Sequence, residues 1–331
     1  MKTVLSLFLS LAALVSVGLI SLLAGENVLT LSQLLGVDTL ADDSVERIIL
    51  YEIRLPRMLM AAACGALLSI SGVIMQGLFR NPLVEPYTMG LSGGALLGVG
   101  MATILGMVES FGSWTVTLMA MVGALVSMAV VLIFRHMTHS GQYAMLLVGV
   151  MISFATSSAN MLLMSLATRD NLSQIVGWSM GTFDAVVPTG AAVMAVVAVV
   201  VAVVSPLAGN VLNILSLGED VAGHLGVNVR LVVSVLFVVA TMLAAACVSE
   251  VGLVAFVGLV VPHVVRRLVG SDHRLLLPLS GVVGAAYMIF CDVLARQVLY
   301  PRELPAGVFS GIIGGFLFIF LVMRRKHHVE A

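Results

Sequence analysis

The stretch RNPLVEPYTMGLSGG, residues Arg80–Gly94, lies between two long uncharged apolar runs. Pro82 and Pro86 disfavour a helix interior, because proline lacks the amide hydrogen and restricts the residue before it. Three glycines follow at positions i, i+3 and i+4, namely Gly90, Gly93 and Gly94. They share one helical face, and small residues let membrane helices approach closely. The stretch therefore predicts an architectural joint between two closely packed apolar helices, rather than a solute site.

The composition around this joint is that of a membrane protein. Of 331 residues, 60% are hydrophobic and only 10% are charged, with a mean hydropathy of +1.14. A soluble domain carries about 25% charged residues. We therefore expect an all-α integral membrane protein, a compact bundle formed by a single polytopic domain over residues 1–331.

Apolar runs along the chain predict about ten transmembrane helices, each close to the roughly 20 residues that cross a bilayer. The runs are 3–25, 58–79, 87–107, 111–134, 142–166, 188–207, 231–249, 251–265, 275–295 and 304–323. The first is too long for the apolar core of a signal peptide, so we interpret it as a retained helix. The eighth is short and contains Pro262, which favours a position enclosed by other helices.

Basic residues orient the bundle. Ten spans place both termini on one side, and a cytoplasmic N-terminus gives ten basic residues inside and six outside, in accord with the positive-inside rule. The inner ten are Lys2, Arg80, Arg135, Arg230, Arg266, Arg267, Arg274, Arg324, Arg325 and Lys326. Both termini are therefore predicted to be cytoplasmic.

The sequence lacks the motifs that several kinds of enzyme and metal site require. Lys2 and Lys326 are the only lysines, and no GxxxxGK motif occurs, so the chain has no phosphate-binding loop of its own. Neither HExxH nor GxSxG occurs, and we expect no catalytic activity, no metal site and no cofactor in this chain. Cys64, Cys247 and Cys291 all lie in apolar runs, which favours small core residues.

The remaining functional class is a protein that moves a solute across the membrane. A stand-alone secondary transporter or channel is one alternative, but ion-driven carriers normally need carboxylates inside the membrane. Only Asp292 and Glu250 qualify here, both near the outer edge. This alternative is therefore the weaker one.

Polar residues of the fifth run share one helical face. They are Ser153, Ser157, Asn160 and Met164, at i, i+4, i+7 and i+11, with Thr156 beside them. Polar groups inside a membrane are candidate functional sites, so this face is a candidate solute path. The alternative is hydrogen bonding between helices.

Two pairs of charged residues are predicted to lie on the outer side. Arg54 and Arg57 flank Pro56, and Asp292 and Arg296 are four residues apart. The second pair is either an ion pair on one helix face or an arginine head presented to an outside partner. Either spot could instead anchor lipid headgroups.

The largest inner loop, residues 215–230, is amphipathic. Leu217, Val221 and Leu225 form an apolar stripe opposite acidic residues, which predicts a short helix on the inner surface. A helix resting on lipid is one interpretation. Two acids and no lysine suit an anionic inner leaflet poorly, so a protein partner is favoured.

Four segments in register resemble one family. They are RLPRMLMAAACGALLSISGVIMQGLFRNPLVEPYTMGLSGGALLG, LGEDVAGHLGVNV, VAFVGLVVPHVVRRLVGSDHRLLLP and ELPAGVFSGIIGG. They resemble the permease subunits of type II ABC importers, the FecCD-like group that takes up iron–siderophores, heme and vitamin B12. The resemblance runs from about Arg54 to Arg325. It implies two permease copies, expected as a homodimer, two separate ATP-binding subunits that hold ATP and Mg, and a periplasmic substrate-binding protein.

The resemblance also implies roles for individual residues. Docking of the binding protein falls on Arg54, Arg57 and Arg296, and the fifth run matches the helix that lines the path. Coupling to the ATPase falls on Gly218, Glu219, Asp220, Gly223, Leu225 and Gly226. The inner gate falls on Gly141, Gln142 and Tyr143, although the family often has small hydroxyl residues there.

The implied function is import across the bacterial inner membrane by alternating access, in contact with the lipid bilayer and without nucleic acid. An iron(III)–siderophore is the first expectation for the solute, and heme or cobalamin is the alternative. The path residues do not discriminate among these chelates.

Overall fold

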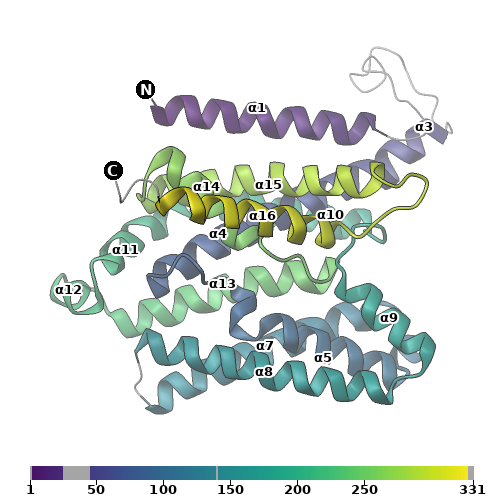
Figure 1. Ribbon diagram of the computed structural model, residues 1–331, viewed down its shortest axis with the longest axis horizontal. Helices are drawn as coiled ribbons and strands as arrows, with labels where there is room; N and C mark the ends of the chain where they lie inside the picture. Colours follow the sequence, from purple (N-terminus) through teal and green to yellow (C-terminus); the bar gives the residue numbers. More distant parts are fainter. Residues whose placement is uncertain (1, 25–44, 139–140, 327–331) are drawn as a thin grey trace.

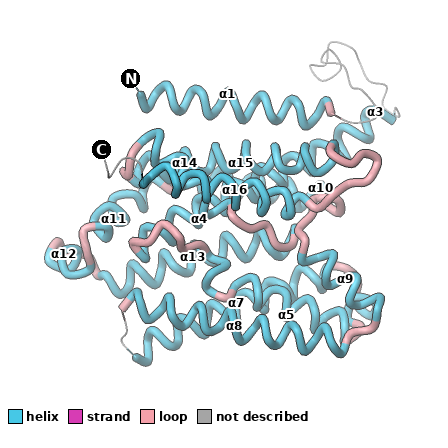
Figure 2. The backbone as a smooth tube through the Cα atoms, in the orientation of Figure 1, coloured by secondary structure: helices cyan, strands magenta, loops and turns pink. Residues whose placement is uncertain are grey.

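The computed structural model describes residues 2–24, 45–138 and 141–326, and within them every regular element is helical. Figures 1 and 2 show these helices running side by side in one bundle. The helices are α1 (Lys2–Leu23), α3 (Val45–Ile48), η1 (Ile49–Arg54), α4 (Leu55–Phe79), η2 (Pro86–Met89), α5 (Leu91–Ile104), α6 (Met107–Phe111), α7 (Trp114–Thr138), α8 (Gln142–Leu166), α9 (Arg169–Ser179), α10 (Pro188–Val204), α11 (Pro206–Ser216), α12 (Glu219–His224), α13 (Val229–Val251), α14 (Val257–Val269), α15 (His273–Gln297) and α16 (Ala306–Lys326). The all-α membrane fold predicted from the sequence is confirmed.

Each predicted apolar run overlaps a helix, but the count of ten crossings is not confirmed. Six helices of the described part are long and apolar enough to span, or seven if the bent pair α10 and α11 is one span. That pair bends by 54° at Pro206, inside the end of the predicted run 188–207. Helices α5 and α16 contain shorter apolar stretches.

Helix α4 lies at the centre of the bundle, and two of its glycines explain how closely its neighbours pack. A Cβ on Gly65 would lie 2.1 Å from the carbonyl oxygen of Gly284 in α15, and one on Gly72 would lie 1.9 Å from that of Gly258 in α14. The helices therefore touch backbone to backbone at both points, as small residues allow.

Helix α14 matches the short eighth run. Most of its first turns are buried, and Pro262 lies inside it. It packs against α4 and α15. The prediction that this segment is enclosed by other helices is therefore confirmed.

The stretch Arg80–Gly94 forms the predicted joint. Arg80 ends α4 in a left-handed conformation with φ of 48°, and Gly90 begins α5 with φ of 83°. Beyond it, Gly93 faces Thr156 of α8, and Gly94 faces Gly123 and Ser127 of α7. The glycines therefore let α5 fit tightly between two neighbours, rather than presenting one face to one helix.

The start of α1 and the end of α16 lie on one side of the bundle. Figure 1 shows the start of α1 and the end of α16 at the end that carries α12, with α3 at the opposite end. This arrangement agrees with the prediction that both termini share a side. The three cysteines are buried and free, as expected of core residues.

Candidate docking, path and coupling sites

Three arginines expected to dock a partner meet at the end of the bundle opposite α12. Arg57 forms ion pairs with three carboxylates at once: Asp292 at 2.9 Å, Asp184 at 3.0 Å and Glu303 at 2.6 Å. Asp292 also pairs with Arg296, at 3.2 Å. The buried carboxylate of Asp292 therefore joins α15 to α4 through Arg57, and it also pairs with Arg296 of its own helix. We call Arg54, Arg57, Arg296, Asp184, Asp292 and Glu303 the outer charge cluster.

Arg54 and Arg296 hold the end of α1. Arg54 Nη1 donates to the carbonyl of Leu22 at 2.7 Å, and Arg296 Nη2 donates to the hydroxyl of Ser21 at 2.8 Å and to its carbonyl at 3.3 Å. The last carbonyls of a helix lack partners within it and carry partial negative charge. The two guanidinium groups therefore cap α1 and attach it to the bundle.

The arginines are not the open heads that docking was expected to present. Their exposed fractions are 7% for Arg54, 7% for Arg57 and 8% for Arg296. The ion pair between Asp292 and Arg296 was one of the two interpretations of their spacing, and the structure confirms it. The docking role stays a prediction.

The polar face of α8 is turned largely toward its neighbours. Asn160 is buried and donates to the carbonyl of Gly93 at 3.0 Å, and Ser153 donates to that of Thr88 at 3.3 Å. Thr156 packs on Gly93. Ser153 and Asn160 therefore make contacts between helices, the kind that the alternative interpretation describes, and the path role stays a prediction. Two members of the predicted path, Ser157 and Met164, keep some exposure.

The predicted gate residues lie where α8 begins. Gly141 is the exposed N-cap, and Tyr143 is 78% exposed. Gln142 instead turns inward, and its side-chain nitrogen is buried without a hydrogen-bond partner. The three residues therefore do not form one surface, and a gating role stays a prediction.

The short helix expected in residues 215–230 is present as α12. Leu217, Val221 and Leu225 are 63%, 45% and 60% exposed, so no described part of the chain covers the apolar stripe. Gly218 and Gly226 flank α12 with φ of +120° and +84°, a region that favours glycine. An exposed apolar stripe of this kind is typical of a surface that binds another protein.

Glu85, in the joint between α4 and α5, is a buried carboxyl that the sequence did not single out. It is 9% exposed, and burial raises its pKa from the usual 4.5 to about 7. Its neighbour Gly258 belongs to α14. The joint therefore contains a titratable group beside the contact of α4 with α14.

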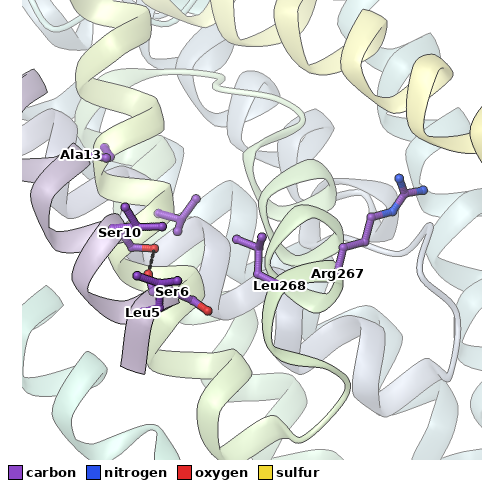
Figure 3. A pocket seen from close by; sticks show the side chains of 9 residues that line it. Leu5, Ser6, Ser10, Ala13, Arg267 and Leu268 are labelled. Carbon is purple, nitrogen blue, oxygen red and sulfur yellow. Dashed lines mark hydrogen bonds between the residues drawn. The ribbon is translucent and has the colours of Figure 1, made fainter. Parts of the chain in front are cut away.

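A cavity of about 480 Å³ lies between α1 and the helices α14 and α15. Figure 3 shows its labelled lining residues, among them Leu5, Ser10 and Leu268. The guanidinium of Arg267 points away from the cavity in this view. The lining is apolar, and it is separate from the outer charge cluster and from α8.

The profile of the FecCD transport family matches residues 13–324. This chain belongs to the FecCD transport family. The match includes the outer charge cluster, the joint and α12. The four segments that suggested the family are all within it, so the resemblance is confirmed.

Named relatives in the family are transporter permeases. The chain is 32% identical to the hemin transport system permease protein HmuU of Yersinia pestis, over 83% of each chain. It is 36% identical to the vitamin B12 import system permease protein BtuC of Klebsiella pneumoniae, over 85% of this chain and 84% of that one. The chain is therefore a multi-pass membrane permease of an ABC transporter.

A solved structure extends the match to the fold. The chain superposes on a metal-chelate type ABC transporter in an inward-facing conformation with a TM-score of 0.85. The two are 31% identical, and the match covers 96% of this chain and 98% of the other. The likeness extends the family assignment to the fold of almost the whole chain.

Proposed function

We propose that this chain is the membrane permease of an ATP-driven, binding-protein-dependent importer that carries a bulky metal chelate inward by alternating access. We propose further that it works as a homodimer with two ATP-binding subunits and a periplasmic binding protein, in the bacterial inner membrane. The observation that carries this is the pair of surfaces at opposite ends of the bundle, α12 and the outer charge cluster. The two surfaces suit an ATPase on one side and a binding protein on the other.

The surface at α12 supports coupling to an ATPase. Its apolar stripe is exposed, while Ala222 beneath it is fully buried, so the helix is anchored on one face and open on the other. Glu219 and Asp220 lie in its first turn, where negative charge is favourable. ATP hydrolysis belongs to the partner chain in this proposal, because no phosphate-binding loop occurs here.

The proposed solute is an iron(III)–siderophore, with heme or cobalamin as the alternative. The named relatives are a hemin transport permease and a vitamin B12 import permease, and the solved relative is described as a metal-chelate type ABC transporter. All of these are bulky chelates, so the class is better supported than any one member. Uptake into proteoliposomes containing the permease, its ATPase and its binding protein tests all three solutes. Transport of none of them would overturn the proposed class.

The ATPase contact has a test of its own. Val221→Asp places a charge in the exposed stripe of α12 without changing its buried side, so we expect a folded permease that no longer co-purifies with the ATPase. Val187→Asp is the matched control, because Val187 is also highly exposed, at 62%, and precedes α10 at the end of the bundle opposite α12. Co-purification of the Val221 variant at the wild-type ratio would contradict the coupling role.

A further inference from the structure

Arg57 lies under two carboxylates that belong to loops. Asp184 is in the loop between α9 and α10, and Glu303 is in the loop between α15 and α16. Their side chains are 49% and 43% exposed, whereas that of Arg57 is 8% exposed. The two loops therefore meet over one guanidinium, and their carboxylates separate it from the solvent.

Among the residues that the structure describes, the outer charge cluster holds equal numbers of positive and negative groups. It contains three guanidinium groups, those of Arg54, Arg57 and Arg296, and three carboxylates, those of Asp184, Asp292 and Glu303. A balanced cluster attracts an acidic partner far less than three free arginines, because the fields of the charges cancel beyond a few ångströms. A partner's carboxylate therefore reaches Arg57 only by replacing one that is already there.

The three carboxylates on Arg57 differ in how readily they can leave. Asp292 is fully buried and also pairs with Arg296, so breaking its contact leaves a buried charge uncompensated. Asp184 and Glu303 are half exposed, and exposed ion pairs contribute little because water solvates the separated charges well. The loop carboxylates are therefore exchangeable, and Asp292 is fixed.

We propose that Asp184 and Glu303 are specificity-determining residues for docking: they occupy Arg57 until a carboxylate of the binding protein replaces them. This inference rests on the proposed function, since it concerns how the docking partner is selected. A partner with a correctly placed carboxylate exchanges one ion pair for another and releases the two loops. A neutral partner finds Arg57 occupied and gains no ion pair.

A first experiment needs no partner. Hydrogen–deuterium exchange of the permease in nanodiscs reports the opening of residues 180–187 and 298–305. We expect Asp184→Asn and Glu303→Gln to speed exchange in these loops, and Glu109→Gln to leave it unchanged. Glu109 is the matched control, because it is an exposed carboxylate in α6, outside the cluster. Unchanged exchange in the double variant would show that Arg57 does not hold the loops, and would overturn the proposal.

A second experiment measures docking. Biolayer interferometry with the substrate-binding protein of the proposed importer gives Kd for the wild type and the variants. Removing one loop carboxylate should lower Kd about two- to fivefold, which corresponds to the free energy of one surface ion pair. Removing both carboxylates should lower Kd further. Glu109→Gln again stays at the wild-type value. Unchanged or weaker docking by the double variant overturns the exchange alone, whereas no docking by the wild type refutes the docking role itself.

Discussion

The contact between α4 and α14 gives a sharp test of the packing. In Gly72→Ala the new Cβ would lie 1.9 Å from the carbonyl oxygen of Gly258, and 2.5 and 2.6 Å from its carbonyl carbon and Cα. All three atoms are backbone, so no side chain can turn away. Ordinary contact begins near 3.4 Å, and the helices must therefore separate by about 1.5 Å, which opens the packing on both sides.

The size of the effect follows from two opposing terms. Overpacking a close-packed interior costs about 1–3 kcal/mol, and a clash with backbone belongs at the upper end. Replacing glycine by alanine within a helix contributes about 1 kcal/mol in the other direction. We therefore expect a net loss of about 2 kcal/mol in the free energy of unfolding, and a fall of several degrees in Tm.

Matched glycines make the test specific. Gly311→Ala in α16 meets nothing within 4 Å, so it should keep or slightly raise Tm. Gly258→Ala is intermediate, because its Cβ would lie 2.9 Å from the carbonyl oxygen of Leu68. Thermal unfolding in nanodiscs, followed by tryptophan fluorescence, should rank Tm as Gly311→Ala, Gly258→Ala, Gly72→Ala from highest to lowest. Equal values for Gly72→Ala and Gly311→Ala would refute this packing.

Two further predictions concern buried acids. The folded protein holds the proton of Glu85 up to about pH 7 and the unfolded chain releases it near 4.5, so stability falls as pH rises between these values, by about 3 kcal/mol. Glu85→Gln should abolish this fall, which Tm measured from pH 5 to pH 8 checks; an unchanged slope would contradict it. Asp292→Asn removes the charge shared by Arg57 and Arg296, and should lower stability by about 3–5 kcal/mol. Denaturation by guanidinium measures this loss, with Glu109→Gln as control, and equal midpoints would argue against the buried pairing.

The sequence predicted the helices well because apolar length is a local property. The run 142–166 coincides with α8 residue for residue, and the stripe in residues 215–230 became α12. The number of membrane crossings was harder to predict, because it depends on how the helices tilt and bend. The break at Pro206 falls within one apolar run, and composition alone does not reveal its angle.

Pairing across the bundle was the part that the sequence did not predict. The ion pair of Asp292 with Arg296 could be predicted as one interpretation of the sequence, because residues four positions apart are neighbours on a helix surface. The partners of Arg57 are 235 and 246 positions away in Asp292 and Glu303, and no periodicity links such positions. Likewise, the period of α8 identified a polar face, but it could not show that Asn160 is covered by the backbone of α5.

Helix α4 connects the two proposed partner surfaces. Arg57 lies in its first turn within the outer charge cluster, and Arg80 at its other end lies 3.6 Å from where a Cβ on Gly218 would stand, beside α12. Twenty-five residues of helix extend about 37 Å. Gly65 and Gly72 bring its backbone into direct contact with α15 and α14, so a displacement of this helix also displaces these neighbours. A signal between docking and coupling would therefore travel as a tilt or slide of α4, and the glycine contacts determine which of these its neighbours allow.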